Sequence, residues 1–408
     1  SQYRIPKRKN KEKTIVSVIP IDKSIAQRCA VLGLDFDKSN IGEDIKSTLN
    51  AAKEFADYQK DLTLNLGNSG TGMRLLAGYI AGFGKKCTLI GDESLSKRPM
   101  DRIAKPLKDW GADIDLRDQK YSPIKINSSN LQAEFTYNLK IPSAQIKSCL
   151  LLAALSSKTK IEIIENIPSR DHTERILEEC EADIRREGNR IIFDGKKDII
   201  KKYIDIPGDF SSAAYLMAAN ILTKKTNQIE NVGINKTRVA FLQVLGEMGA
   251  KVLIRNPSIE SNETRANLVT FCEDKLKGVT IDGDRIPNLI DEIPLIAILA
   301  MFAEGKTIVK DAKELRYKES DRIGLLLSNI RSFNPDIGIK EFDDGFEIEP
   351  AEDNNMGKVK IKTNGDHRMV MSFMVASLRS GKEIEFDDMK CVETSFPGFF
   401  SLMKKWYQ

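Results

Sequence analysis

The sequence is poor in histidine and tryptophan, with two of each among 408 residues, and it has no long hydrophobic run. Its longest apolar stretches, 149–155 and 295–303, are far shorter than the roughly 20 residues that a helix needs to cross a bilayer. We therefore expect no membrane span. The 41% apolar and 30% charged composition is typical of a globular protein, and a chain of this length predicts two domains rather than one core.

Cysteine pairs of the C-x-x-C kind are also missing. The six cysteines, at 29, 87, 149, 180, 272 and 391, are widely spaced. This pattern argues against a disulfide framework or a zinc site and predicts reduced thiols in the cytoplasm. Since no other metal-ligand spacing occurs in the sequence, we predict that the protein uses no metal and no cofactor.

A strong excess of one charge is absent as well, because 63 lysines and arginines stand against 59 acidic residues. The two signs are interspersed and no segment interleaves arginines with aromatic residues, so nucleic acid is not an expected partner. Residues 7–13 are locally basic. They precede an alternating segment, 14–19, and this order predicts a solvated arm that runs into a strand.

The sequence contains a repeated helix–turn–strand segment. The segments LKDWGADIDL, LEECEADIRR and LGEMGAKVLI each predict an amphipathic helix, a tight turn and a strand, and a looser copy, IRSFNPDIGI, follows. Their alanines, Ala112, Ala182 and Ala250, lie about 70 residues apart. This period predicts a supersecondary unit that buries its apolar face against copies of itself.

A second phrase occurs six times: a strand, a short polar loop, and a helix that is apolar on nearly all sides. Helices of this kind are buried, so the loops before them should face a shared cleft rather than bulk solvent. Helix N-termini carry unpaired amides and partial positive charge, and a cluster of them predicts an anion site.

Basic side chains accumulate in and around these loops. Forked guanidinium groups and compact ammonium groups suit phosphates and carboxylates, so we predict small, strongly anionic substrates. The basic residues are Lys23, Arg28, Arg74, Arg98, Lys147, Arg170, Lys318, Arg322 and Arg368.

Together these motifs resemble the enolpyruvyl transferases and, within them, the 5-enolpyruvylshikimate-3-phosphate synthase family. The resemblance extends from about residue 22 to about residue 400 and depends on segments in a fixed order. They are GNSGTGMR (67–74), SKRPMDRI (96–103), SAQIKS (143–148), SRDHTE (169–174), PGDFSSAA (207–214), LIDEIP (289–294), ELRYKESDRI (314–323) and GDHRM (365–369).

The resemblance implies an α/β (α+β) fold: a two-domain inverse α/β barrel of repeated β-α-β-α-β-β units, with the active site in the cleft between the domains. Residues 1–20 and 209–408 would form one discontinuous domain of three units, and residues 21–208 an inserted domain of three units. The first inserted unit is expected to be shortened, because only about 31 residues connect Leu34 to Leu64. Two domains of one chain can close without a partner subunit, so we expect a monomer.

The resemblance also implies the reaction, in which the enolpyruvyl group of phosphoenolpyruvate moves to the 5-hydroxyl of shikimate-3-phosphate and phosphate is released. The residues that match shikimate-3-phosphate contacts are Lys23, Ser24, Arg28, Ser143, Ala144, Gln145, Ser169, Asp291 and Lys318. Those that match phosphoenolpyruvate contacts are Lys23, Gly70, Arg98, Gln145, Arg322 and Arg368.

Such a transfer needs a base for the hydroxyl proton, an acid for the methylene carbon, and cations for the departing phosphate. Asp291 and Glu319 match the two acid-base carboxylates, with Lys23 assisting proton transfer. His367 matches an active-site histidine of the family, and His172 a ring that contacts the shikimate substrate.

Two positions qualify the resemblance. Ile21 replaces a glycine that is general in the family, and a β-branched residue lacks glycine's backbone freedom at this hinge. Gly70 leaves open the space that a bulkier residue would take from the herbicide glyphosate, so we expect glyphosate to compete with phosphoenolpyruvate.

Two alternatives remain at this point. The enolpyruvyl transferase that acts on UDP-N-acetylglucosamine shares the fold, but it typically uses a cysteine before its Arg-Pro, and GDESLSKRP has none. A catalytically inert anion-binding or RNA-binding relative would lack an acid-base residue, whereas Lys23, Asp291, Glu319 and His367 are all present.

Overall fold

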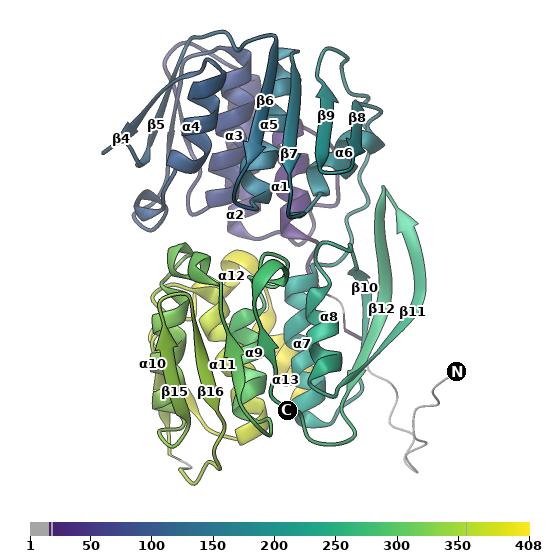
Figure 1. The fold of residues 1–408 in the computed structure, drawn as a ribbon, viewed down its shortest axis with the longest axis vertical. Coiled ribbons are helices and arrows are strands. Elements are labelled where there is room, and N and C mark those ends of the chain that lie inside the picture. The colour runs from purple at the N-terminus through teal and green to yellow at the C-terminus, as the bar shows by residue number, and fades with distance from the viewer. Residues whose placement is uncertain (1–15, 18, 356) are drawn as a thin grey trace.

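The computed structural model describes residues 16–17, 19–355 and 357–408, which form two α/β halves, upper and lower in Figure 1. The basic arm expected at 7–13 lies outside the described residues. The strand expected after it is represented by β1 (Val16–Ser17), which pairs in parallel with β10 (Gln228–Gly233) of the lower half.

Four sheets of the described chain share one design, two in each half. In each sheet the first and second strands are parallel, and the fourth strand lies between the second and third, antiparallel to both. The upper half carries β2 (Leu62–Asn65), α3 (Gly70–Phe83), β3 (Cys87–Ile90), α4 (Asp101–Trp110), β4 (Asp113–Arg117) and β5 (Tyr121–Asn127), then β6 (Glu134–Leu139), α5 (Ala144–Ser157), β7 (Lys160–Glu165), α6 (His172–Glu179), β8 (Asp183–Glu187) and β9 (Arg190–Asp194).

The lower half repeats this order. It carries β1 and β10 with α7 (Phe210–Thr223), α8 (Ala240–Glu247), β11 (Lys251–Glu260) and β12 (Glu263–Phe271), then β13 (Thr280–Ile281), α9 (Ile293–Met301), β14 (Thr307–Val309), α10 (Arg322–Phe333), β15 (Gly338–Phe342) and β16 (Gly345–Glu349). The predicted α/β fold of repeated units is confirmed. Ala112, Ala182 and Ala250 each stand between a helix and the first strand of a hairpin, as the period of about 70 residues predicts.

The remaining unit of each half is reduced. In the lower half β17 (Val359–Ile361) and β18 (Ile384–Phe386) form a two-stranded parallel sheet, accompanied by α11 (His367–Ser380), α12 (Cys391–Ser395) and α13 (Phe399–Tyr407). In the upper half α1 (Lys23–Leu32) and α2 (Glu43–Ala56) precede β2, and residues 33–61, all described, contain no strand. That this unit is shortened relative to the family stays a prediction.

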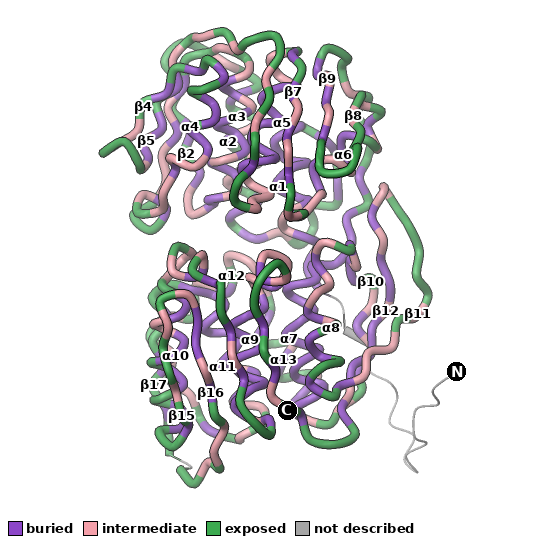
Figure 2. The backbone as a smooth tube through the Cα atoms, in the orientation of Figure 1, coloured by how far each residue is buried: buried purple, intermediate pink, exposed green. Residues whose placement is uncertain are grey.

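Each half has its own hydrophobic core, and buried backbone concentrates on the central helices in Figure 2. Helices α5, α7 and α9 are apolar on nearly all sides because they lie inside these cores, where few faces meet water. Core membership changes twice along the chain: Ile19 belongs to the lower core and Ile25 to the upper, while Ile206 belongs to the upper and Phe210 to the lower.

The chain thus passes between the halves at two neighbouring segments, which we call the crossover segments (residues 20–22 and 207–209). They pair with each other: Ile21 and Gly208 form an antiparallel bridge, and the amide of Asp22 donates to the carbonyl of Pro207 at 2.8 Å. The extended pairing suits a β-branched residue, so Ile21 needs no glycine-like freedom here. We propose the domain boundaries at 20/21 and 208/209 on this basis.

None of the described helices combines the length and apolarity needed to cross a membrane.

Candidate active site between the two halves

Six helices begin at the junction of the halves, as the second repeated phrase predicts: α1, α3, α5, α7, α9 and α11. Five of them have a short side chain that accepts an amide hydrogen bond at the first turn. These N-caps are Asp22, Ser69, Ser143, Asp209 and Asp366. Each cap satisfies one of the free amides, and the rest of the first turn keeps its partial positive charge toward the junction.

The predicted substrate residues gather around two adjoining cavities at this junction, the larger of about 430 Å³ and the smaller of about 290 Å³, and a third cavity of about 690 Å³ lies beside them. Most of the predicted substrate residues line the larger one: Lys23, Ser24, Arg98, Ser143, Ala144, Gln145, Ser169, Asp291, Lys318, Glu319, Arg322, His367 and Arg368. Gly70 lines the smaller cavity. The two cavities share Lys23, Thr71, Arg98, Glu319 and His367, so side chains from both halves meet where the cavities join.

Arg28 and His172 line neither of these cavities. The guanidinium of Arg28 is buried and donates to Thr173 Oγ1 at 2.7 Å, to the Ser24 carbonyl at 2.7 Å and to Ser148 Oγ at 3.0 Å. His172 Nδ1 lies 2.7 Å from Glu263 Oε1. A substrate contact by either side chain stays a prediction.

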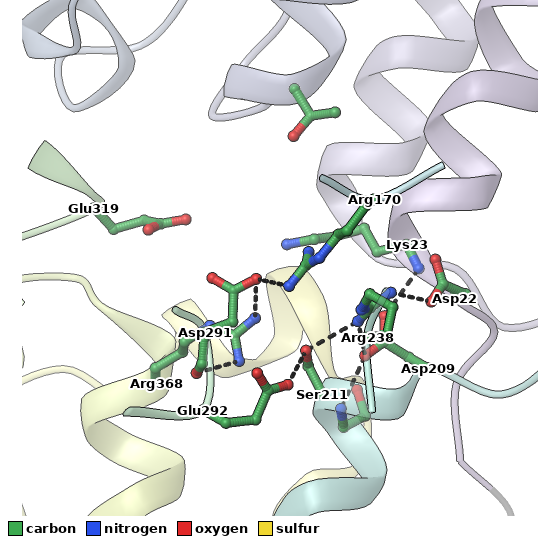
Figure 3. A network of polar contacts seen from close by, with 12 residues as sticks. Asp22, Lys23, Arg170, Asp209, Ser211, Arg238, Asp291, Glu292, Glu319 and Arg368 are labelled. Atoms are coloured by element: carbon green, nitrogen blue, oxygen red, sulfur yellow. Dashed lines mark hydrogen bonds and ion pairs between the residues drawn. The ribbon is translucent and has the colours of Figure 1, made fainter. Parts of the chain in front are cut away.

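Asp291 is held by an arginine from the opposite half. Its Oδ2 lies 2.7 Å from Arg170 Nη2 of the upper half (Figure 3). Its Oδ1 lies 3.7 Å from Arg322 Nη1. Burial by itself would raise the pKa of Asp291, but Arg170, then Arg368, Lys318 and Arg322, hold it well below its usual value. This carboxylate is ionised at neutral pH and able to accept a proton.

Glu319 lies between two arginines. Its Oε1 is 3.3 Å from Arg98 Nη2 of the upper half, and its Oε2 is 2.5 Å from Arg322 Nη2. Arg322 is 1% exposed and also pairs with Asp366, 2.8 Å from its Nε. Burial would raise the pKa of Glu319, but the charges of Arg322, Arg98 and Lys23 together hold it well below the usual value.

Two basic side chains nearby, His367 and Lys318, have lowered pKa values. Burial, followed by the charges of Lys23 and Arg368, lowers the pKa of His367 to about 3, although Glu319 and Asp366 oppose this. Burial also lowers the pKa of Lys318, with Asp291 acting in the opposite direction. His367 is therefore a neutral ring among charges.

Gly70 leaves room for the ends of two arginine side chains. A Cβ atom on this residue would stand 2.4 Å from Arg98 Nη1 and 3.3 Å from Arg74 Nη1. Arg74 in turn donates to Gln145 Oε1 at 2.6 Å, and Gln145 Nε2 donates to Thr71 Oγ1 at 3.1 Å. The start of α3 and the start of α5 are thus joined through side chains on the floor of the cavity.

Ser169 is oriented by the buried ion pair of Glu165 and Lys147. Its hydroxyl donates to Glu165 Oε1, and Glu165 pairs with Lys147 at 3.1 Å in an environment where both side chains are at most 1% exposed. Because the hydroxyl proton is used internally, Ser169 presents oxygen lone pairs to the cavity and accepts hydrogen bonds there.

The motifs did not point to two features of the cleft. One is the bidentate pair in which Arg102 of α4 meets Glu314 across the halves, with nitrogen–oxygen distances of 2.5 and 2.9 Å. The other is Arg238, which lines the larger cavity. It stands in GINKTRVAF, outside the motifs that carried the resemblance; a buried charge beside the crossover segments has no signature in a single sequence.

The fold and this site define a two-domain transferase of the inverse α/β class. The EPSP synthase (3-phosphoshikimate 1-carboxyvinyltransferase) family profile matches residues 22–403. A 3-phosphoshikimate 1-carboxyvinyltransferase of Leptospira interrogans is 38% identical, covering 98% of this chain and 99% of the relative, and one of Thermoanaerobacter sp. is 37% identical over 97% of each. A solved EPSP synthase structure from Acinetobacter baumannii has a TM-score of 0.79 and 33% identity over 96% of both chains. The chain belongs to the EPSP synthase family.

The neutral state of His367 gives the first prediction. The unfolded chain binds a proton at this ring below about pH 6.5, whereas the folded protein does not until about pH 3. Between these values the unfolded state holds more protons, so stability is lost as the pH falls. Asp291 and Glu319 act in the same direction only below about pH 4. We expect His367→Gln to flatten the decline of the urea midpoint between about pH 6.5 and 4.5.

Nitrogen NMR of the imidazole rings checks the same point directly, because the chain has only two histidines. The His367 signals should stay those of a neutral ring throughout the folded range. A His367 midpoint near the ordinary value would contradict the burial and charge argument.

Proposed function

We propose that this protein transfers the enolpyruvyl group of phosphoenolpyruvate to the 5-hydroxyl of shikimate-3-phosphate and releases phosphate, in the biosynthesis of chorismate and aromatic amino acids. The observation that carries the proposal is a pair of carboxylates, Asp291 and Glu319, each held ionised by an arginine of the opposite half within cavities that helix N-termini surround. The curated relatives carry the name of this activity.

The two cavities suggest how the roles divide. Asp291 lines only the larger cavity, together with Ser143, Gln145 and Ser169, which are predicted to hold shikimate-3-phosphate. Glu319 lines both, at the junction near Gly70, the predicted phosphoenolpyruvate side. We therefore assign to Asp291 the removal of the 5-hydroxyl proton and to Glu319 protonation of the methylene carbon.

Cations at the junction suit the charge that develops during transfer. Three guanidinium groups lie at the junction, those of Arg98, Arg322 and Arg368. Glu319 and Asp291 neutralise part of their positive charge in the free protein. When substrate anions take these guanidinium groups, the carboxylates lose part of the charge that keeps their pKa values low. Glu319 would then bind a proton more readily at the moment that the reaction needs an acid.

The remaining assignments belong to the proposal as well. Two halves of one chain supply the complete set of predicted residues, so a monomer suffices for the reaction. Small anionic substrates, no nucleic acid, no metal and a cytoplasmic location complete the proposed description.

Release of inorganic phosphate from phosphoenolpyruvate tests the proposal, with shikimate-3-phosphate and UDP-N-acetylglucosamine as separate acceptors. We expect release with shikimate-3-phosphate alone, and a loss of at least about 100-fold in kcat for Asp291→Asn and Glu319→Gln, because each removes a proton-transfer group.

Glu187→Gln is the matched control for these variants, since Glu187 is an exposed carboxylate that pairs with Arg185 at the surface. It should keep full activity. Release with the sugar nucleotide would assign the protein to the other enolpyruvyl transferase, and release with neither acceptor would sink the proposal.

Gly70→Ala tests the phosphoenolpyruvate side separately. The added methyl group must displace Arg98, which lies 2.4 Å from the Cβ position. We expect KM for phosphoenolpyruvate to rise about tenfold or more, KM for shikimate-3-phosphate to change little, and competition by glyphosate to weaken with it. An unchanged KM for phosphoenolpyruvate would show that Arg98 does not bind this substrate.

A further inference from the structure

Arg238 precedes α8 and has no role in the proposed reaction, yet its guanidinium is among the most buried charges of the cleft. The side chain is 3% exposed and lies beside the crossover segments (Figure 3). A buried ion pair contributes little net stability, because the loss of hydration offsets the attraction between the charges. Its role therefore lies in the geometry that the forked group imposes.

One arm of the fork reaches the first crossover segment. Nη1 of Arg238 donates to Asp22 Oδ2 at 2.6 Å. The other oxygen of Asp22 accepts the amide of Ile25 at 2.9 Å and so caps α1, whose first residue is Lys23. The charge of Arg238 and the amide hydrogen bond from Ile25 overcome the effect of burial and lower the pKa of Asp22 to about 2, which keeps this cap ionised.

The other arm reaches α7, just after the second crossover segment, and through it the residue that follows the general base. Nη2 of Arg238 donates to Ser211 Oγ at 3.0 Å, and Ser211 Oγ donates to Glu292 Oε1 at 2.7 Å. Glu292 directly follows Asp291 and stands at the N-cap position of α9. A single planar group therefore lies between the start of α1, which carries Lys23, and the start of α9, which Asp291 precedes.

A third contact closes the arrangement. Asp209, which caps α7, accepts the backbone amide of Lys23 on Oδ2 at 3.0 Å, and its Oδ1 lies 3.9 Å from Arg238 Nη2. Lys23 is thus held through its own amide and through the neighbouring Asp22. Both carboxylates lie beside the same guanidinium.

We propose that Arg238 is a positioning residue that fixes Lys23 relative to Asp291 by joining Asp22 to the Ser211–Glu292 pair. This inference depends on the proposed function, since it assumes that Lys23 and Asp291 act in one reaction. Catalytic groups must be held close to the productive geometry, and a displacement of about 1 Å costs about 100-fold in rate. Loss of the link should therefore lower kcat more than it raises either KM.

Arg238→Lys and Ser211→Ala test the link in steps. Lysine keeps the charge but cannot bind Asp22 and Ser211 together, and we expect kcat to fall about tenfold or more with both KM values within about threefold. Ser211→Ala removes one hydroxyl and leaves the pair of Arg238 with Asp22, so a smaller fall in kcat is expected. If Arg238→Lys does not fold, the kcat of Ser211→Ala still tests the link.

Ser212→Ala is the matched control. Ser212 is the next buried residue of the same helix, and among the described residues no hydrogen bond of its side chain is found; only its amide bonds to Asp209. This variant should keep kcat within about twofold, because it removes a hydroxyl without breaking the link.

Rates are compared per folded molecule, so a purely structural role for Arg238 would leave kcat unchanged and would overturn the proposal. A rise in KM at constant kcat would also overturn it, because Arg238 would then bind substrate directly.

Amide hydrogen exchange gives a reading that does not depend on catalysis. If Arg238 joins the segments, Ser211→Ala should speed exchange at the amides of Lys23 and Ile25 as well as at residues 291–293. Faster exchange confined to the neighbourhood of Ser211 would contradict the link. Absence of phosphate release by the unmodified protein would instead sink the proposed function, and exchange alone would then decide whether Arg238 joins the two segments.

Discussion

The arrangement of the cleft depends on one buried cation, Arg322. It is 1% exposed and forms ion pairs with Glu319 and Asp366, while Asp291 lies 3.7 Å away. A guanidinium at that depth is tolerable only among carboxylates, and those carboxylates are ionised only because arginines surround them. The acid-base residues and the anion-binding residues are therefore parts of one electrostatic balance, which each half supplies in part.

This balance explains why the chain builds its site from repeated units rather than from one elaborate loop. Each unit places a buried helix with its N-terminus at the junction, and six such termini point their free amides at the same space. Arg98 and Arg170 from the upper half then reach Glu319 and Asp291 of the lower half. Substrate anions can replace these carboxylates as partners of the same arginines, so binding, closure and the pKa of the general acid are coupled.

Most of the fold and of the cleft could be predicted from the sequence, because the features that indicate them are local in the chain. The alanine period at Ala112, Ala182 and Ala250 predicted the units, and the polar loops before apolar helices predicted a shared anion cleft. What single-sequence reasoning missed depends on tertiary proximity. Arg238 meets Asp22 from 216 residues away, and Arg102 meets Glu314 from 212 residues away. Ile21 stands where the family generally has glycine, which put the backbone at the hinge in question. Its bridge to Gly208 is extended pairing, which a β-branched residue tolerates. Arg28 has the motif of a ligand contact and also donates to Thr173 and Ser148, so its substrate contact stays a prediction.

The most direct test of the central claim is a crystal structure of the protein with shikimate-3-phosphate and glyphosate bound together. The account predicts anionic oxygens of the ligands at hydrogen-bond distance from Arg98 and Arg322, and an Arg98–Glu319 separation larger than the 3.3 Å of the free protein. Ligands bound outside the two cavities, or bound inside them without contact to these arginines, would contradict it.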